Sequence, residues 1–281
     1  MQVHETIDGF RKALDAERAA GRTVGLVPTM GFLHAGHASL MARAAAECDI
    51  AAATIFVNPL QFAPHEDLDA YPRDIEGDLA TASAAGVAHA FTPSLNEMFP
   101  GEVATSIHVT GVSEAMEGAS RPGHFDGVAT VVAKLFAIAG PCRAYFGEKD
   151  YQQLAVIRRM VDDLALPVTV VACETVRDAT GLALSSRNAY LSDDERRAAA
   201  VLSRALRAGL DLIAAGVRDA DAVRVAIVDE VEGEPRADLD YAAVVDAATL
   251  RPIQQISGEV RLLVAARVGA TRLIDNAGAS A

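Results

Sequence analysis

Cysteine is scarce in this chain. Its 281 residues include three cysteines, Cys48, Cys142 and Cys173, which lie far apart and form no Cys-x-x-Cys pair. This spacing predicts neither a disulfide framework nor a zinc site. We therefore expect buried apolar thiols in a reducing cytosol.

A targeting signal and a membrane-spanning run are also missing. The N-terminal stretch MQVHETIDGFRKAL has no basic region followed by an apolar one. The longest apolar stretch, residues 128–140 (VATVVAKLFAIAG), is too short to span a bilayer and contains Lys134. We expect a cytoplasmic protein without a membrane partner.

Positive charge is in the minority. The formal net charge is -13 and the isoelectric point is about 4.9, so bulk attraction to nucleic acid or to anionic lipid is not expected. An anionic ligand would need a local group of basic residues. Hydrophobic residues make up 51% of the chain, which is enough for a sizeable core.

Helical and strand patterns alternate through the first part of the chain. This alternation predicts a doubly wound α/β domain with a parallel, Rossmann-like sheet over residues 1–176. The expected strands are 23–28, 50–57, 87–93, 143–147 and 167–176, and the expected helices are 5–20, 37–48, 74–86, 127–140 and 150–166.

The pattern changes after residue 176. Residues 178–191 form a polar, glycine-containing linker, and Ser192 with Glu195 has the spacing of a capping box for a helix running to about residue 215. Residues 240–247 and 259–276 alternate like antiparallel strands. Residues 177–281 therefore predict a second, smaller α+β domain.

Two histidines, His34 and His37, stand in the stretch PTMGFLHAGHASL between an expected strand and an expected helix. The carboxyl end of a strand in such a sheet is where ligands bind, and a helix N-terminus suits phosphate. Gly31, Ala35 and Gly36 would let a polyphosphate approach the backbone closely. Taken alone, the pair also fits a surface loop or half of a metal site, although the chain shows no HExxH or cysteine partner.

Two further motifs extend this pattern. GEKD (147–150) follows an expected strand, and LSSR (184–187) lies in the polar linker. Each alone is typical of a solvated loop. Together with the histidines they supply a lysine, hydroxyls and a guanidinium for one triphosphate.

Longer segments carry a resemblance to a known family. PTMGFLHAGH, FVNPLQF, HEDLDAYPRD, RPGHFDGVATVV, FGEKDYQQL and VRDATGLALSSRNAYL are similar to the pantoate–β-alanine ligases, which belong to the HxGH nucleotidylyltransferase superfamily. The resemblance implies condensation of pantoate with β-alanine, with ATP and Mg²⁺, through a pantoyl-adenylate, releasing AMP and pyrophosphate. It also implies a cytoplasmic homodimer.

The resemblance also implies roles for individual residues. His34, His37, Lys149, Ser186 and Arg187 would act on the phosphoryl groups, with His37 as proton donor. Gln61 and Gln153 would hold pantoate, Gln61 would also lie next to β-alanine, and Asn58 resembles a further active-site residue. Asp78 is the candidate Mg²⁺ ligand. The implied ATP-binding set is Met30, Gly31, Phe32, Leu33, His34, Ala35, Gly36, His37, Gly147, Glu148, Lys149, Asp150, Val176, Leu184, Ser185, Ser186 and Arg187.

Three alternatives compete with this interpretation. Another nucleotidylyltransferase would share HxGH, but neutral amides at Gln61 and Gln153 favour pantoate over a phosphate-bearing acceptor. A tRNA-aminoacylating enzyme is disfavoured by the acidic balance. An idle ATP-binding module is disfavoured because both histidines, Lys149 and Arg187 are present. The sequence leaves open which group accepts the amine proton, and whether Arg121 and His124 touch substrate or only shape a loop.

Overall fold

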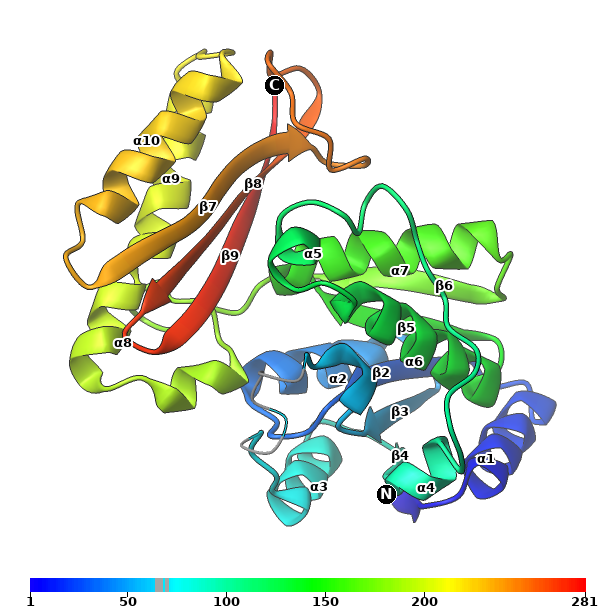
Figure 1. Ribbon diagram of the computed structural model, residues 1–281. Coiled ribbons are helices and arrows are strands. Elements are labelled where there is room, and N and C mark those ends of the chain that lie inside the picture. The colour runs from blue at the N-terminus through cyan, green and yellow to red at the C-terminus, as the bar shows by residue number, and fades with distance from the viewer. Residues whose placement is uncertain (64–67, 69–70) are drawn as a thin grey trace. The chain divides into compact units, whose positions relative to one another are not determined.

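The computed structural model describes residues 1–63, 68 and 71–281 (Figure 1). Part of the motif HEDLDAYPRD, residues 64–67 and 69–70, lies outside the described residues. The chain divides into two compact units. The first contains Met1–Gly147 and Val156–Glu174, and the second contains Glu148–Ala155 and Thr175–Ala281.

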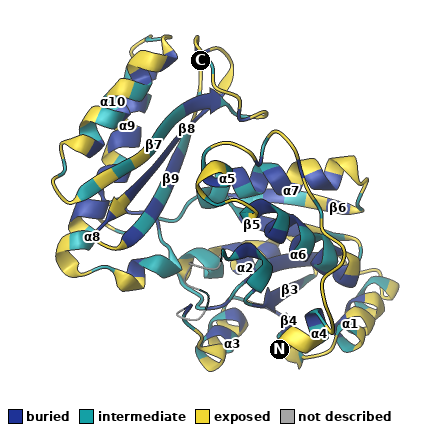
Figure 2. Ribbon diagram, in the orientation of Figure 1, coloured by how far each residue is buried: buried dark blue, intermediate teal, exposed yellow. Residues whose placement is uncertain are grey.

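The first unit is built on a parallel sheet with the strand order β1-β4-β3-β2-β5-β6. Long runs of β2 and β3 are buried at consecutive positions, so both faces of the sheet are covered, as is usual for parallel sheets (Figure 2). The predicted α/β class is confirmed. The strands are β1 (Gln2–His4), β2 (Val24–Thr29), β3 (Ile50–Ile55), β4 (His89–Phe91), β5 (Cys142–Gly147) and β6 (Val168–Cys173).

The winding of this sheet reverses between β2 and β5. From β2 the chain proceeds outward through β3 and β4, whereas β5 and β6 extend the sheet in the opposite direction. Open α/β sheets bind ligands outside the carboxyl ends of their strands at such a reversal. The loop that follows β2 ends at His34, and His37 lies in the first turn of α2. Both histidines of the HxGH motif are therefore near the position where this fold class places a ligand.

Helices with side-chain caps flank the sheet. Thr6 caps α1 and Asp74 caps α3, and each side chain accepts a hydrogen bond from a backbone N–H of the first turn. α1 packs with α6, and α2 packs with α3. The helices are α1 (Ile7–Ala19), α2 (Ala35–Glu47), α3 (Ile75–Ala84), α4 (Leu95–Met98), α5 (Glu117–Ser120), α6 (His124–Ala139) and α7 (Tyr151–Asp163), with a 3-10 turn η1 (Pro59–Gln61).

The second unit contains an antiparallel sheet in the order β7-β8-β9, with α9 and α10 on one face (Figure 1). Leu202, Leu206, Ile227, Leu262 and Val264 are fully or nearly fully buried between these layers. The elements are η2 (Glu148–Asp150), η3 (Ser186–Tyr190), α8 (Asp193–Ala199), α9 (Val201–Ala214), α10 (Ala220–Glu232), β7 (Ala237–Asp246), β8 (Glu259–Val268) and β9 (Thr271–Ser280).

The predicted capping box is present, since Ser192 and Glu195 bond reciprocally at the start of α8. The single helix expected up to residue 215 is wrong in one respect: the structure breaks it at Ala200, where α8 ends and α9 begins. Among the described residues, no helix combines the length and the apolarity needed to cross a bilayer.

Candidate active site

The loop after β2 makes a sharp turn before α2 begins. Gly31 has φ of 89° and Phe32 has φ of 51°, so two successive residues adopt left-handed backbone conformations. A Cβ added at Gly31 would lie 2.8 Å from Oδ2 of Asp78 and 3.2 Å from Cγ2 of Ile55. Glycine is therefore required here for its conformation and for its small size.

The two histidines cap α2 reciprocally. His34 is the N-cap, and its Nδ1 accepts a hydrogen bond from the Gly36 N–H at 3.1 Å. Nδ1 of His37 accepts from the His34 N–H at 3.4 Å, and the ring centroids are 4.1 Å apart. Because Nδ1 is the acceptor in both rings, the neutral imidazoles carry their proton on Nε2. Each histidine is thus orientated by the helix and has an Nε2–H donor.

Asp78, on α3, fastens the same loop. Its carboxylate accepts the backbone N–H groups of Phe32 at 2.9 Å and Leu33 at 2.6 Å, and the residue is only 3% exposed. Burial raises the pKa of Asp78, the two N–H groups oppose that rise, and the nearby Asp74 adds to it. The sequence predicted Asp78 as a candidate metal ligand. In the structure both of its carboxylate oxygens accept backbone N–H groups of the loop.

A buried amide pair lies beside this loop. Asn58 caps the turn η1, and its Nδ2 donates to Oε1 of Gln61 at 3.1 Å and to the Gly127 carbonyl at 3.1 Å. Asn58 is 1% exposed and Gln61 is 8% exposed. Nε2 of Gln61 lies 3.0 Å from Sδ of Met30. Three predicted site residues are therefore brought together in the first unit.

The turn that carries Gln61 is held closely against α6. A Cβ added at Gly127 would lie 2.1 Å from the Leu60 carbonyl oxygen, so helix and turn touch through their backbones. Arg121 and His124 hold the other side. His124 Nδ1 donates to the Gln61 carbonyl at 2.8 Å, and an Arg121 guanidinium N–H donates to it at 3.3 Å. The sequence left the role of these two residues open. In the structure they orientate the Gln61 backbone.

The other candidate residues, apart from Gly147, lie in the second unit. Lys149 stands in η2, and its Nζ is 3.3 Å from the Asp150 carboxylate. Ser185 accepts the Arg187 N–H at 3.3 Å and caps η3. Val176 and Leu184 are joined by a backbone hydrogen bond of 2.9 Å, which closes the loop before Ser185. Gln153 is half-buried on α7, while Gly147 ends β5 in the first unit.

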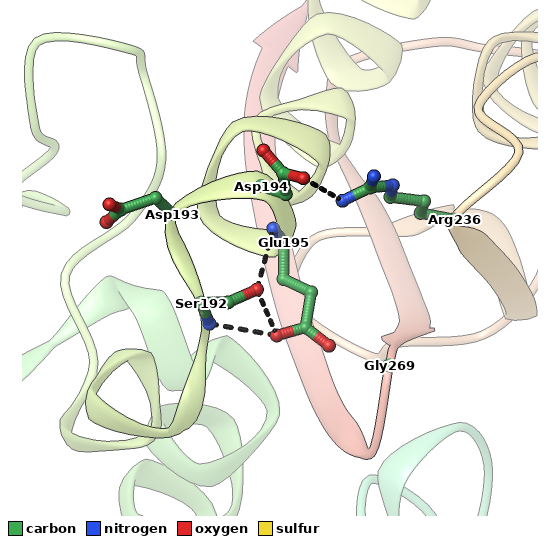
Figure 3. Close-up of a pocket in the computed structure, with 6 residues that line it drawn as sticks. All are labelled: Ser192, Asp193, Asp194, Glu195, Arg236 and Gly269. Carbon is green, nitrogen blue, oxygen red and sulfur yellow. Dashed lines mark hydrogen bonds and ion pairs between the residues drawn. The ribbon is translucent and has the colours of Figure 1, made fainter.

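A pocket in the second unit is chemically unsuited to ATP (Figure 3). Its polar walls are paired with one another: Ser192 bonds Glu195, and Asp194 forms an ion pair with Arg236 at 3.0 Å. Three carboxylates line it, which would repel phosphate. Its lining, Ser192, Asp193, Asp194, Glu195, Arg236 and Gly269, contains none of the predicted site residues.

Comparison with known proteins decides the family. The model of the pantoate-beta-alanine ligase family matches residues 2–278. The chain belongs to this family. It is 52% identical over 276 residues to the pantothenate synthetase of Rhizobium etli, covering 98% of this chain and 93% of that protein. The pantothenate synthetase of Moorella thermoacetica is also 52% identical, with 98% of each protein covered.

Solved structures agree with this assignment. The crystal structure of pantothenate synthetase from Thermus thermophilus matches with a TM-score of 0.94 and 48% identity, over 99% of both chains. The pantoate-beta-alanine ligase of Francisella tularensis, complexed with beta-gamma ATP and beta-alanine, matches with a TM-score of 0.80 and 32% identity, over 99% of this chain and 97% of that one. The predicted fold class and the predicted ligase class are confirmed.

Proposed function

We propose that the chain condenses pantoate with β-alanine in two steps, through a pantoyl-adenylate, with release of pyrophosphate and then AMP. The observation that carries this proposal is the loop after β2. Two imidazoles are orientated there by the helix N-terminus, and each has an Nε2–H donor near the reversal of the sheet. The ligase from F. tularensis was crystallised with beta-gamma ATP and beta-alanine, which supports ATP as a substrate here.

In the first step, the pantoate carboxylate attacks the α-phosphorus and pyrophosphate leaves. Negative charge grows on the phosphoryl oxygens, and hydrogen-bond donors fixed in advance lower the barrier most effectively. Nε2–H of His34 and His37 would supply such donors, with His37 as proton donor. Lys149, Ser186 and Arg187 would supply a cation, a hydroxyl and a guanidinium. The residues already named for ATP, Met30–His37, Gly147–Asp150, Val176 and Leu184–Arg187, complete the proposed set.

Pantoate has two hydroxyl groups, and another of its carbons carries two methyl groups. Its site therefore needs amides beside apolar atoms. Gln61 provides this combination, because its amide lies against the Met30 sulfur and is fixed by Asn58. We assign Gln61, Asn58 and Gln153 to pantoate, with Gln61 also next to β-alanine. In the second step the neutral amine of β-alanine attacks the acyl carbon of the adenylate. A C–N bond forms, the bond from the acyl carbon to the phosphate oxygen breaks, AMP leaves, and the nitrogen releases one proton.

Mg²⁺ fits this chain as a partner of the nucleotide. Both oxygens of Asp78 already accept backbone N–H groups, and no cluster of three or more His, Cys, Asp or Glu able to hold a metal occurs among residues 1–63, 68 and 71–281. Mg²⁺ commonly binds through one or two carboxylates and several substrate oxygens. We therefore propose that Mg²⁺, when present, would be held mainly by the ATP phosphates and would offset their charge, while Asp78 holds the loop after β2.

Three wider assignments are proposed, on the sequence pattern for the domains and on the family resemblance for the location and the oligomeric state. We propose that residues 1–176 form the ATP- and pantoate-binding domain, with residues 177–281 as the smaller domain. We also propose that the enzyme is a cytoplasmic homodimer. Sedimentation equilibrium would give twice the mass of the 29.4 kDa chain if the dimer is correct, and the monomer mass if it is not.

The function is tested by following pyrophosphate, AMP and pantothenate. Purified enzyme is incubated with ATP, Mg²⁺ and pantoate, with and without β-alanine. We expect pyrophosphate release that requires pantoate, and AMP with pantothenate once β-alanine is added. Absence of pantoate-dependent pyrophosphate would refute the proposal, and the glutamine assignments would be withdrawn first.

A further inference from the structure

Two adjacent buried residues of β9, Asp275 and Asn276, bond to two separate loops of the second unit. Asp275 is 3% exposed and Asn276 is 4% exposed. Successive side chains of a strand point to opposite faces, so neighbouring residues can serve different segments. Asn276 bonds to the turn that carries Lys149, and Asp275 bonds to Arg177, at the start of the segment that leads to Ser185–Arg187.

Asn276 holds the Lys149 loop by its backbone. Its Nδ2 donates to the carbonyl of Glu148 at 2.9 Å and to the carbonyl of Lys149 at 2.7 Å. Its Oδ1 accepts from Nε of Arg261 at 2.7 Å. One amide therefore uses both donors on the loop and its acceptor on a neighbouring strand.

Arg261, on β8, makes further contacts with the Lys149 loop. Its guanidinium donates to the Glu148 carboxylate at 3.0 Å and lies 3.9 Å from the ring centroid of Tyr151. The guanidinium thus combines an ion pair with a cation–π contact on residues that flank Lys149. A Cβ added at Gly278 would lie 2.9 Å from an Arg261 guanidinium nitrogen, so glycine leaves room for the guanidinium in its present position.

Asp275 holds the second loop through Arg177. The two side chains form a bidentate ion pair at 2.6 and 2.8 Å, and the hydrogen bond to Asp275 raises the pKa of Arg177. Arg177 also donates to the Gly181 carbonyl at 3.0 Å and pairs with Ala183 as a β-bridge. The chain enters Ser185 directly from this closed loop.

We propose that Asp275 and Asn276 are positioning residues, which hold the backbone segments from which Lys149 and Ser185–Arg187 act on ATP. The proposal rests on the proposed function of those residues. Groups held in place before the substrate binds lose less freedom on binding, and a small misplacement of a catalytic group can cost roughly a hundredfold in rate. Neither positioning residue has to touch ATP.

Asn276→Asp tests whether Asn276 holds the Lys149 loop. An aspartate keeps an oxygen that accepts from Arg261, but it has no donors for the carbonyls of Glu148 and Lys149. The control is Asn96→Asp on exposed α4, which makes the same chemical change on the surface of the first unit. We expect kcat/KM for ATP in the pyrophosphate assay to fall about tenfold to a hundredfold, with KM for pantoate unchanged. Amide hydrogen exchange at residues 148–151 should accelerate in the free variant.

Asp275→Asn tests whether the ion pair with Arg177 holds the segment that leads to Ser185. It removes the charge and the bidentate geometry but keeps the shape of the side chain. Exchange should accelerate at residues 177–187 and stay slow at 148–151, the reverse of the Asn276→Asp pattern. If the sheet were weakened in general, both segments would exchange faster in both variants. Faster exchange in only one segment per variant is therefore not expected from such weakening.

The proposal is overturned if Asn276→Asp leaves both kcat/KM for ATP and exchange at 148–151 at their wild-type values. It is also overturned if exchange rises evenly across β7–β9 and every kinetic constant changes together, since that would show a purely structural role. Failure of the proposed function is a different result, in which wild-type enzyme releases no pantoate-dependent pyrophosphate. Even then, ATP binding to wild type and variant, measured by calorimetry, decides whether the loops depend on Asn276.

Discussion

His34 and His37 serve the helix and the proposed chemistry with different ring atoms. Nδ1 of each ring bonds to a backbone N–H at the start of α2, while Nε2 is the donor in the proposed chemistry. The two roles can therefore be separated by a side chain that replaces only the Nδ1 acceptor. A glutamine at the third position of a helix is such a side chain, because its oxygen can complete a capping box.

His37→Gln should therefore keep the cap and lose the imidazole. We expect pantoate-dependent pyrophosphate release to slow by roughly 10²- to 10³-fold, with little change in the melting temperature. The control is His108→Gln, since His108 is exposed and bonds to Asp126 at the surface. A His37→Gln rate close to that of wild type would remove His37 from the proposed mechanism.

Individual residues show where sequence reasoning succeeds and where it stops. His34 and Gln61 were found because they lie in ordered motifs whose chemistry is readable from residue type and spacing. Asn276 was not, because it acts through backbone carbonyls 128 residues away in the chain, and nothing in its local sequence marks that contact. Long-range hydrogen bonds of this kind are specified by the fold.

At the scale of elements, a histidine pair adds a side-chain contact to the parallel pairing of β1 with β4. Nε2 of His4 lies 3.1 Å from Nδ1 of His89 on β4, and Nε2 of His89 lies 3.2 Å from the Glu17 carboxylate of α1. The His4 ring also lies 5.8 Å from the Phe10 ring. Burial, and secondarily the neighbouring His89, lower the pKa of His4 below its ordinary value of 6.5.

This arrangement predicts a pH-dependent stability. Below about pH 6.5 the unfolded state binds a proton at His4 more readily than the folded state does, so the free energy of unfolding falls as pH falls through this window. His4→Gln should lose less stability than wild type between about pH 7 and pH 5.5. Denaturant unfolding at both pH values measures this, with His108→Gln as the control. Identical pH slopes for wild type and His4→Gln would contradict the prediction.

The elements also differ in how far sequence patterns could define them. β2, β3 and β5 were predicted within a few residues, because buried strands of a parallel sheet are short apolar runs. β1 was missed, since three residues, Gln2–His4, give no detectable period. The break at Ala200 was missed as well, because alanine favours a continuous helix and no glycine or proline stands near it in the sequence.

At the scale of the whole molecule, the chain passes between its two units three times. The crossings are after Gly147, after Ala155 and after Glu174. The segment Glu148–Ala155 therefore precedes the end of the first unit in sequence but belongs to the second by its contacts. Periodicity could not reveal this, since η2 and the start of α7 follow β5 without a break in pattern.

A fragment of residues 1–176 should consequently lack ATP-dependent activity. It would contain Lys149 but neither Arg261 nor Asn276, so the loop would lose its ion pair and both carbonyl bonds. We expect no pantoate-dependent pyrophosphate release and fast amide exchange at residues 148–151, with strands β2 and β3 still protected. A fragment that retained slow exchange at 148–151 would show that β8 and β9 are not needed to order this loop.

The separation of Glu148 from Asn276 has a consequence for the nascent chain. The ribosome must add 128 residues after Glu148, the last of them Asn276, before the Lys149 loop can receive its support, long after the parallel sheet has been synthesised. The Lys149 loop therefore becomes ordered only at the end of translation. A prematurely terminated chain would contain the parallel sheet but would lack the support for the loop that we propose acts on ATP.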